Sequence, residues 1–535
     1  MLKELIIYGL NDMSGFIIKE ISGIDLVSSF IVNFLRIQYG PILANNLFTI
    51  ISLLLSILST FFLVHRLKVS SISSFIFIIL YSFSVYLVYR LISLTPGLYL
   101  VFIFPLTLYF LIEKTKPLIL GLWVLFSLAL VNYYGFFSFI LVTFWYLYSL
   151  CIKKINVKEF FKKVGMFLLP IIVGVAVFFG PTLVNNIPIF GKYEKPTVQE
   201  KASGVNRFYR PIEDWYNLSF RPWYFFIPPK SSVFFGDLSK NIYNKIEAGG
   251  YYLADDYMEE EMAGSYMGWH FLLGLGVVGT LLLLKKFKNI EFKTFKTVYE
   301  NEEMIARSFF IIFCILLISG PPSFTIHGIE IYTPTYLLYY IIPVFRTLVR
   351  WAVVIYLFVL IINAFLIQDL YNLMKTKFQK VLFILTFIIL NFVIFAIKIP
   401  VININNPPQE IAYVKEKYPE SVSYAVYPKG DYYSIFWIIS HEDLLINPVN
   451  FVNYETGFDS NEFSKNLVTE DGVKEFLNKD PKYLIYYPEN VSEDDLEKIS
   501  ELNLDIQSRD DIYQFFSENF GESVKVGKSV VFEIN

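Results

Sequence analysis

The sequence predicts a polytopic α-helical membrane protein with a small α/β domain at its C-terminal end, and three observations lead to this fold class. Of 535 residues, 55% are hydrophobic and only 17% are charged. The apolar residues form long uncharged runs, which are typical of membrane helices. Lysines collect between these runs, at residues 153–163, 285–296 and 375–380, and the composition turns polar and acidic after Lys398.

The apolar runs predict about ten membrane spans, because a spanning helix needs roughly 20 apolar residues. The run from Pro117 to Ile152 is long enough for two spans, and the NYYG sequence at 132–135 is the predicted turn between them. The predicted spans lie near residues 43–64, 71–89, 98–112, 118–131, 136–152, 164–184, 265–284, 308–320, 351–370 and 381–398.

The segment Thr335–Phe345 is apolar but only half as long as a span, and prolines bracket it. Lys and Arg accumulate on the cytoplasmic side of membrane proteins. If this segment dips into the membrane and returns, every lysine cluster falls on one side, including residues 66–68 and 114–116. We therefore predict a re-entrant segment and a cell-membrane protein whose lysine clusters face the cytoplasm.

This topology divides the chain into three parts. Residues 1–42 form an outer N-terminal segment, residues 43–398 form the membrane domain with a large outer loop at 185–264, and residues 399–535 form a soluble extracytoplasmic domain. In the last part, strand-like runs at 422–427, 483–487 and 529–534 alternate with helical patterns at 462–477 and 492–502. The second helix opens on a capping-box-like sequence at Ser492.

Composition also limits the partners and cofactors. The net charge of −3 gives no indication of a nucleic-acid partner. Cys151 and Cys314 lie inside apolar runs, which favours buried packing over a disulfide scaffold or a zinc site. The four histidines have no metal-ligand spacing.

Two arginines at the predicted outer face, Arg346 and Arg350, are the first candidate site. On a helix, residues four apart share one face, and the planar fork of arginine suits a phosphate group. The alternative is that these side chains reach for lipid headgroups or pair with an acid of the 185–264 loop. Spacing alone leaves both interpretations open.

The 185–264 loop is the second candidate site. Residues 207–229 are rich in aromatic side chains and arginine, and Tyr251–Glu261 contains a run of acids. Aromatic rings can stack on sugars while carboxylates bind hydroxyls or act as bases, and an acidic cluster could bind a divalent cation. The alternative is a solvated acidic edge packed on the membrane domain. The candidate catalytic acids here are Asp255, Asp256, Glu260 and Glu261.

Several short sequences, taken in order, resemble the large prokaryotic membrane proteins of the YfhO type and their archaeal relatives, which are grouped with the GT-C superfamily of glycosyltransferases. The matching sequences are YGPILANN at 39–46, HRLKVS at 65–70, FPL at 104–106, NYYG at 132–135, FIPP at 226–229, YMG at 266–268 following Glu261, and FRTLVR at 345–350. The C-terminal domain is similar to the outer domain of the same proteins.

This resemblance implies a GT-C-like bundle that holds a polyprenyl-phosphate-linked sugar at the outer face and transfers the sugar to a glycan or protein acceptor. In that superfamily an acid in the first outer loop is catalytic, and Asp12 lies in the corresponding stretch, with the first span expected to be missing. Outer-face basic residues contact the lipid phosphate, which is the role implied for Arg346 and Arg350. A non-catalytic relative that binds or presents lipid-linked glycans is the alternative function. Transport is disfavoured, because the spans contain no chain of acids and no repeat.

Overall fold

The computed structural model describes residues 26–39, 41–92, 96–186, 212–248, 259–326, 329–341, 347–398, 408–419, 422–428, 444–446, 452–453 and 458–534. The chain divides into two compact units. The larger unit comprises residues 1–193 and 208–400, and the smaller comprises residues 194–207 and 401–535. Each unit has its own hydrophobic core and is described by itself below.

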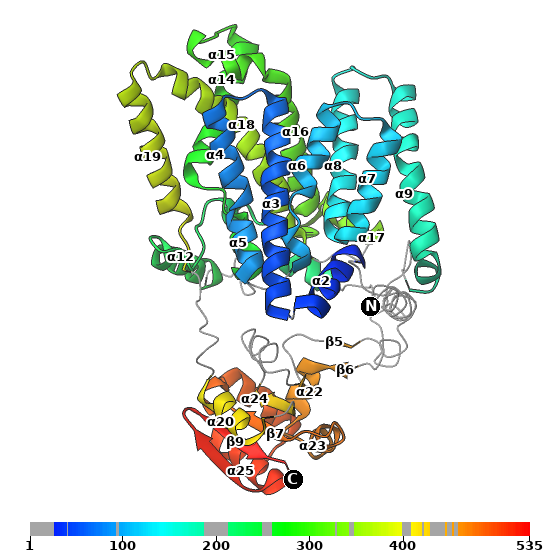
Figure 1. Ribbon diagram of the computed structural model, residues 1–535, viewed down its shortest axis with the longest axis vertical. Helices are drawn as coiled ribbons and strands as arrows, with labels where there is room; N and C mark the ends of the chain where they lie inside the picture. The colour runs from blue at the N-terminus through cyan, green and yellow to red at the C-terminus, as the bar shows by residue number, and fades with distance from the viewer. Residues whose placement is uncertain are drawn as a thin grey trace. The chain divides into compact units, whose positions relative to one another are not determined.

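The larger unit is a bundle of helices (Figure 1). Its elements are α2 (Leu26–Tyr39), α3 (Pro41–Leu67), α4 (Ser71–Ser82), α5 (Val85–Ile92), η1 (Pro96–Tyr99), α6 (Ile103–Ile112), α7 (Pro117–Leu130), α8 (Asn132–Cys151), α9 (Val157–Asn186), α11 (Ile212–Asn217), η2 (Pro222–Phe225), α12 (Gly236–Ala248), α13 (Glu259–Met262), η3 (Ala263–Ser265), α14 (Trp269–Lys288), η4 (Lys293–Phe295), α15 (Lys296–Glu300), α16 (Glu302–Ser319), β1 (Ser323–Ile326), β2 (Ile329–Tyr332), α17 (Pro334–Ile341), η5 (Leu348–Trp351), α18 (Ala352–Leu373) and α19 (Lys377–Phe395).

Helix α18 is the centre of this bundle. Within the apolar part of Leu348–Leu373, 94% of the residues are buried by the surrounding helices, whereas only 6% are buried in Lys377–Phe395. The few polar side chains of α18 bond to its neighbours. Asn363 donates to the carbonyl of Phe271 at 3.2 Å, and the carboxylate of Asp369 accepts from two backbone N–H groups at the start of α15, both at 3.0 Å.

Seven helices in the described parts of the chain are long and apolar enough to cross a membrane. The prediction of about ten spans is not confirmed. The predicted spans 98–112 and 118–131 correspond to α6 and α7, which have 10 and 14 residues. The predicted span 308–320 belongs to α16, whose first turn carries Glu302 and Glu303. Apolar runs include loop residues that hydropathy cannot distinguish from helix, so the sequence overstates the lengths of short helices.

The predicted turn between 118–131 and 136–152 lies slightly earlier than expected. Helix α7 ends at Leu130, Val131 is extended, and Asn132 already begins α8. Gly135 of α8 lies directly against the backbone of α7. A Cβ added to Gly135 would lie 2.3 Å from the backbone nitrogen of Leu128, so any larger residue would force the two helices apart.

We expect Gly135→Ala to lower the free energy of unfolding by about 1–3 kcal/mol, because overpacking against backbone cannot be relieved by a side-chain rotation. Gly276→Ala in α14 is the matched control, since a Cβ there meets no atom within 4 Å. In a helix that change should be neutral or stabilising. Denaturant unfolding of the two variants in detergent would test this. Equal stabilities would contradict the close approach of α7 and α8.

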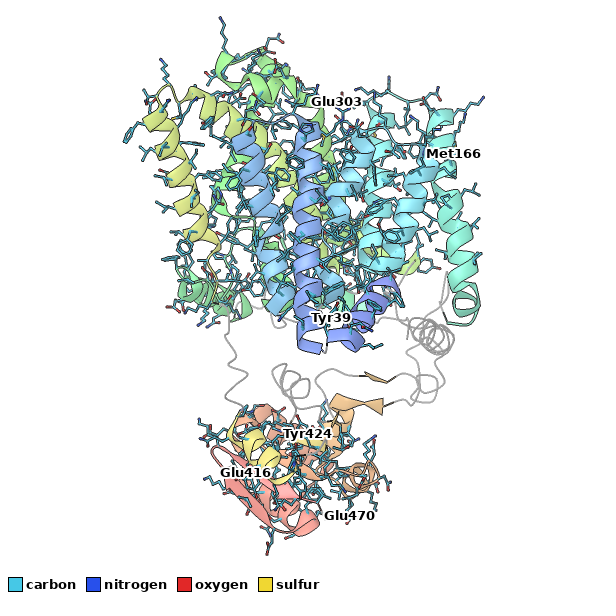
Figure 2. All side chains as sticks on the ribbon, in the orientation of Figure 1. Tyr39, Met166, Glu303, Glu416, Tyr424 and Glu470 are labelled. Atoms are coloured by element: carbon cyan, nitrogen blue, oxygen red, sulfur yellow. The ribbon has the colours of Figure 1, made fainter. Side chains whose placement is uncertain are left out.

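The five lysine clusters gather at one end of the larger unit, the upper end in Figure 1. Arg66 at the end of α3 pairs with Glu113 after α6. Glu303 at the start of α16 pairs with Lys154 after α8, and Lys285 at the end of α14 pairs with Glu302 at 2.9 Å. Near the end of α18, the side chain of Gln368 accepts from Ser70 N–H at 2.9 Å, which ties this helix to the same end. Figure 2 shows Glu303 at this lysine-rich end and Tyr39 at the opposite end.

The described chain on both sides of the segment predicted to be re-entrant lies at the end opposite the lysines. The carbonyl of Ser319, the last residue of α16, accepts a hydrogen bond from Phe220 N–H at 2.7 Å. Two residues earlier, the carbonyl of Leu218 accepts from Val349 N–H at 3.0 Å. Between these points, α17 has only 8 residues, too few to cross a bilayer. The chain therefore leaves α16 and enters α18 at the same end, as the lysine distribution predicted.

The smaller unit is an α/β fold. Its five-stranded sheet has the order β4-β3-β7-β9-β8, with β3 parallel to β4 and β7, and β9 antiparallel to β7 and β8. The elements are α20 (Gln409–Lys417), β3 (Ser423–Tyr427), β4 (Leu444–Leu445), β5 (Val452–Asn453), β6 (Phe458–Asp459), α22 (Ser460–Asn466), α23 (Glu470–Leu477), β7 (Tyr483–Tyr486), η6 (Pro488–Asn490), α24 (Glu493–Leu502), α25 (Arg509–Phe520), β8 (Ser523–Val526) and β9 (Ser529–Glu533).

The two faces of this sheet bury alternate residues, as a strand pattern requires. Leu484 and Tyr486 pack with Phe516 of α25 on one face, and Tyr483 and Ile485 pack with α20 on the other. The three strands and the helix with a capping box at Ser492 are confirmed. The predicted helix 462–477 is wrong in one respect: it is two helices, because the side chain of Thr469 caps a new start.

Candidate functional site

Three charged side chains meet at the end of the larger unit opposite the lysines. Glu261 of α13 accepts two hydrogen bonds from Arg350, from Nε to Oε2 at 3.1 Å and from Nη2 to Oε1 at 2.6 Å. Arg90, in the last turn of α5, contacts Oε2 of the same carboxylate at 2.9 Å. The side chains of Arg90, Arg350 and Glu261 are 1%, 13% and 14% exposed. We call this arrangement the Arg–Glu–Arg cluster.

Aromatic side chains hold the two guanidinium groups. Arg350 lies over the ring of Tyr133 at 4.8 Å, and Arg90 lies over the ring of Tyr86 at 5.1 Å, which are cation–π distances. The hydroxyl of Tyr134 donates to the carbonyl of Leu98 at 2.7 Å and lies 3.0 Å from the hydroxyl of Tyr86. The arginines are therefore fixed by rings as well as by the carboxylate.

The local chain path brings the three residues together. Gly264, three residues after Glu261, lies so close to Tyr86 that an added Cβ would be 3.0 Å from the Tyr86 Cα. This close approach brings the end of α13 against α5. On the other side, the hydrogen bond between Val349 N–H and the Leu218 carbonyl anchors η5 and thereby Arg350. The cluster thus depends on segments that are far apart in the sequence.

The electrostatics of the cluster favour a permanent charge on Glu261. Burial alone raises the pKa of this carboxyl, but Arg350 and Arg90 outweigh burial and lower the pKa to about 2. A carboxylate with so low a pKa is a weak base. Among the described side chains, two arginines face one carboxylate in this cluster.

This geometry gives Arg350 one of the partners that the sequence allowed. The sequence left open that Arg350 pairs with an acid of the 185–264 loop, and the structure contains such a pair. The helical turn that contains Arg350 begins at Leu348, because Thr347 has non-helical dihedral angles, and a face shared with Arg346 stays a prediction. Arg346 itself lies outside the described residues.

The other predicted acids are not brought into this site by the described structure. Asp12, Asp255 and Asp256 lie outside the described residues. Glu260 belongs to α13, whose backbone is described, but its side chain is not. Among the described residues, no group of three His, Cys, Asp or Glu side chains could hold a metal ion. The predicted divalent cation therefore remains a prediction.

The aromatic part of the loop has a structural role where it is described. Trp215 is fully buried and contacts Tyr339 edge-on at 5.3 Å, so its ring cannot stack on a sugar. Arg221 is also fully buried and donates to the Ser219 carbonyl at 2.9 Å. Trp223 and Phe226 keep part of their surface exposed. Tyr216 and Phe225 are also partly exposed, and Phe208 and Tyr209 lie outside the described residues, so the sugar-stacking interpretation remains a prediction for the rings other than Trp215.

Sequence reasoning missed Arg90. Its signal was present, since an arginine in an otherwise apolar stretch is costly in a membrane and has a partner or a task. The partner could not be recognised, because Glu261 is remote in sequence and lies among other acids.

Comparisons with known proteins add no identification. No protein-family model matches the sequence. A comparison with curated proteins also gives no match.

Proposed function

We propose that this chain is a membrane glycosyltransferase that takes a sugar from a polyprenyl-phosphate-linked donor at the end of the membrane unit opposite the lysine clusters. The positive-inside rule makes that end the outer, extracytoplasmic face. The acceptor is a cell-surface glycan or a glycoprotein. The smaller α/β unit lies outside the cytoplasm in this proposal.

The observation that carries the proposal is the Arg–Glu–Arg cluster, in which two buried arginines contact one carboxylate. Glycosyl transfer from such a donor leaves a polyprenyl phosphate, whose developing negative charge needs fixed positive charge at low dielectric. Arg90 and Arg350 are held in place before any substrate arrives, which is the preorganisation that this stabilisation requires. Glu261 then orients the arginines. The base for the acceptor hydroxyl comes from Asp255, Asp256, Glu260 or Asp12.

One observation favours a second candidate, a non-catalytic protein that binds or presents lipid-linked glycans. Glu261 is the only predicted catalytic acid with a described side chain, and both of its oxygens bond to arginines. A site that holds its carboxylate in this way binds an anion without needing to move a proton.

A transfer assay on sealed vesicles would test both candidates. Full-length protein, with its orientation determined by protease protection, would receive radiolabelled polyprenyl-phosphate-linked hexoses and an extract of cell-envelope glycans. We expect labelled product only when the extract is on the side opposite the lysine clusters. Binding of the donor without transfer would favour the non-catalytic candidate. If polyprenyl phosphate binds no better than uncharged polyprenol, both candidates are contradicted.

A further inference from the structure

A pocket of about 680 Å³ opens at the lysine-rich end of the larger unit, opposite the Arg–Glu–Arg cluster. This volume is in the range of small-molecule sites. Four chain segments line the pocket: the α6–α7 connection, the end of α8, the start of α9 and the start of α16. The charged side chains that line it are Lys114, Lys154, Lys163, Arg307, Glu159, Glu300 and Glu303.

Arg307 is the most deeply placed of these charges, with a side chain only 8% exposed. Its guanidinium carbon lies 3.9 Å from the ring centre of Trp145 and 4.9 Å from that of Tyr148. Among the described residues, the one acceptor that Arg307 contacts is Glu303, at 3.1 Å from Nη2. The two rings and Glu303 hold this guanidinium in place. Because a guanidinium carries five N–H donors, Arg307 still has donors to offer to a ligand.

The charges of the pocket do not cancel. Glu159 pairs with Lys163 at 2.8 Å, and Glu300 pairs with Lys296 of α15 at 3.5 Å. Glu303 is shared by two cations, Arg307 and Lys154. Lys114 adds a further positive charge at the exposed rim. The lining therefore has an excess of positive charge, and the arginine fork among these cations suits a phosphate oxygen pair.

The position of the pocket fits a lipid headgroup. Trp145 and Tyr146 line the pocket and Tyr148 contacts Arg307, and such residues concentrate at the membrane–water interface. Helix α9, which forms one wall, has only 22% of its apolar part buried by the rest of the chain, so this side of the bundle faces lipid. Basic pockets between membrane helices bind anionic headgroups.

We propose that this pocket binds a phosphate ester, supplied by the headgroup of an anionic phospholipid in the adjacent leaflet. Arg307 contacts the phosphate oxygens at the bottom of the pocket, and Lys114 and Lys154 surround it at the rim. This site is independent of the glycosyltransferase proposal, since it lies at the other end of the membrane unit.

Native mass spectrometry of the full-length protein in neutral detergent would test the site. The probes are phosphatidylglycerol, phosphatidylcholine and soluble glycerol phosphate. Arg307→Lys keeps the charge but removes the planar fork, and Lys114→Gln removes an exposed charge without disturbing the core. Lys288→Gln is the control, because it removes the same charge at the same end from a residue outside the pocket.

We expect phosphatidylglycerol to be retained more strongly than phosphatidylcholine, and its affinity to fall at least tenfold in Arg307→Lys and several-fold in Lys114→Gln, but not in Lys288→Gln. If glycerol phosphate displaces the lipid at equal concentration, a soluble phosphate ester is the ligand and the lipid source is wrong. If the Arg307→Lys variant does not fold, the affinity of the Lys114→Gln variant for phosphatidylglycerol is the test of the site. Equal losses in Lys114→Gln and Lys288→Gln, or no loss in either, would overturn the site.

Discussion

Replacing Glu261 with glutamine is expected to lower the free energy of unfolding by about 3–5 kcal/mol, because removal of one partner leaves the other buried charges uncompensated. Arg90 is essentially fully buried and Arg350 nearly so, and both contact this carboxylate. Glutamine keeps the shape of the side chain but removes the negative charge between two cations. Unfolding by a denaturing detergent, followed by tryptophan fluorescence, would measure the loss.

The control is Asp237→Asn, which removes an acid with a side chain 97% exposed and a distant lysine partner at 3.9 Å. Its stability should equal that of the wild type. The pKa of Glu261 is lowered to about 2, so its stabilisation is complete above the ordinary carboxyl pKa and disappears only as the pH falls toward 2. The loss in Glu261→Gln should therefore be the same at pH 5 and pH 8. A loss no larger than that of Asp237→Asn would contradict the buried cluster.

Replacing Arg350 with alanine is expected to weaken the binding of polyprenyl phosphate by about 2–5 kcal/mol, the cost of losing one side of a buried charge-assisted contact. Glu261 keeps Arg90 as a partner in this variant, so folding should be less affected than in Glu261→Gln. Arg350→Lys retains the charge and loses the planar fork, and its affinity should fall between wild type and alanine. Equilibrium binding of labelled polyprenyl phosphate to purified protein would give the three affinities.

Arg66→Ala is the control for this series, because Arg66 is a half-exposed arginine at the lysine-rich end, paired with Glu113. It should bind polyprenyl phosphate like the wild type. If a folded Arg350→Ala variant also binds like the wild type, Arg350 serves only to neutralise Glu261, and the proposed polyprenyl-phosphate site loses its main support.

Charge was the most informative property of the sequence. The lysine clusters predicted which helix ends lie together, and the pairs Arg66–Glu113 and Lys154–Glu303 join those ends. The same reasoning predicted that the chain enters and leaves the Thr335–Phe345 region at one end. The free-energy cost of a charge in a membrane depends on the depth of that charge. The order of the spans along the sequence largely fixes this depth, so charge predicts which helix ends lie together.

Hydropathy was less informative about position within the bundle. Helices α18 and α19 have nearly the same mean hydropathy, but α18 is the centre and α19 the periphery. Lipid tails are as apolar as a helix core, so both environments select the same residues. Polar residues distinguish α18 better: Asn363, Gln368 and Asp369 each bond to another segment of the bundle.

The Arg–Glu–Arg cluster could be predicted only in part, because its residues are far apart in the sequence. Arg350 and Glu261 were both recognised, but as separate groups with separate tasks. Their contact spans 89 residues of chain, and no local pattern specifies a partner at that distance. The packing of Gly264 against Tyr86 and the anchoring of Val349 to Leu218 create the contact, and neither can be read from spacing.

The Arg–Glu–Arg cluster has a consequence for biosynthesis. Arg90 is made first, at the end of α5, and its partner Glu261 emerges only after several more helices. Arg350 follows 89 residues later. Until Glu261 is made, Arg90 lacks the carboxylate that it contacts in the folded protein, and a charge without this contact is costly in lipid. We therefore expect α5 to reach its final packing only after Glu261 has been made, and this end of the bundle to close only when α18 packs into it.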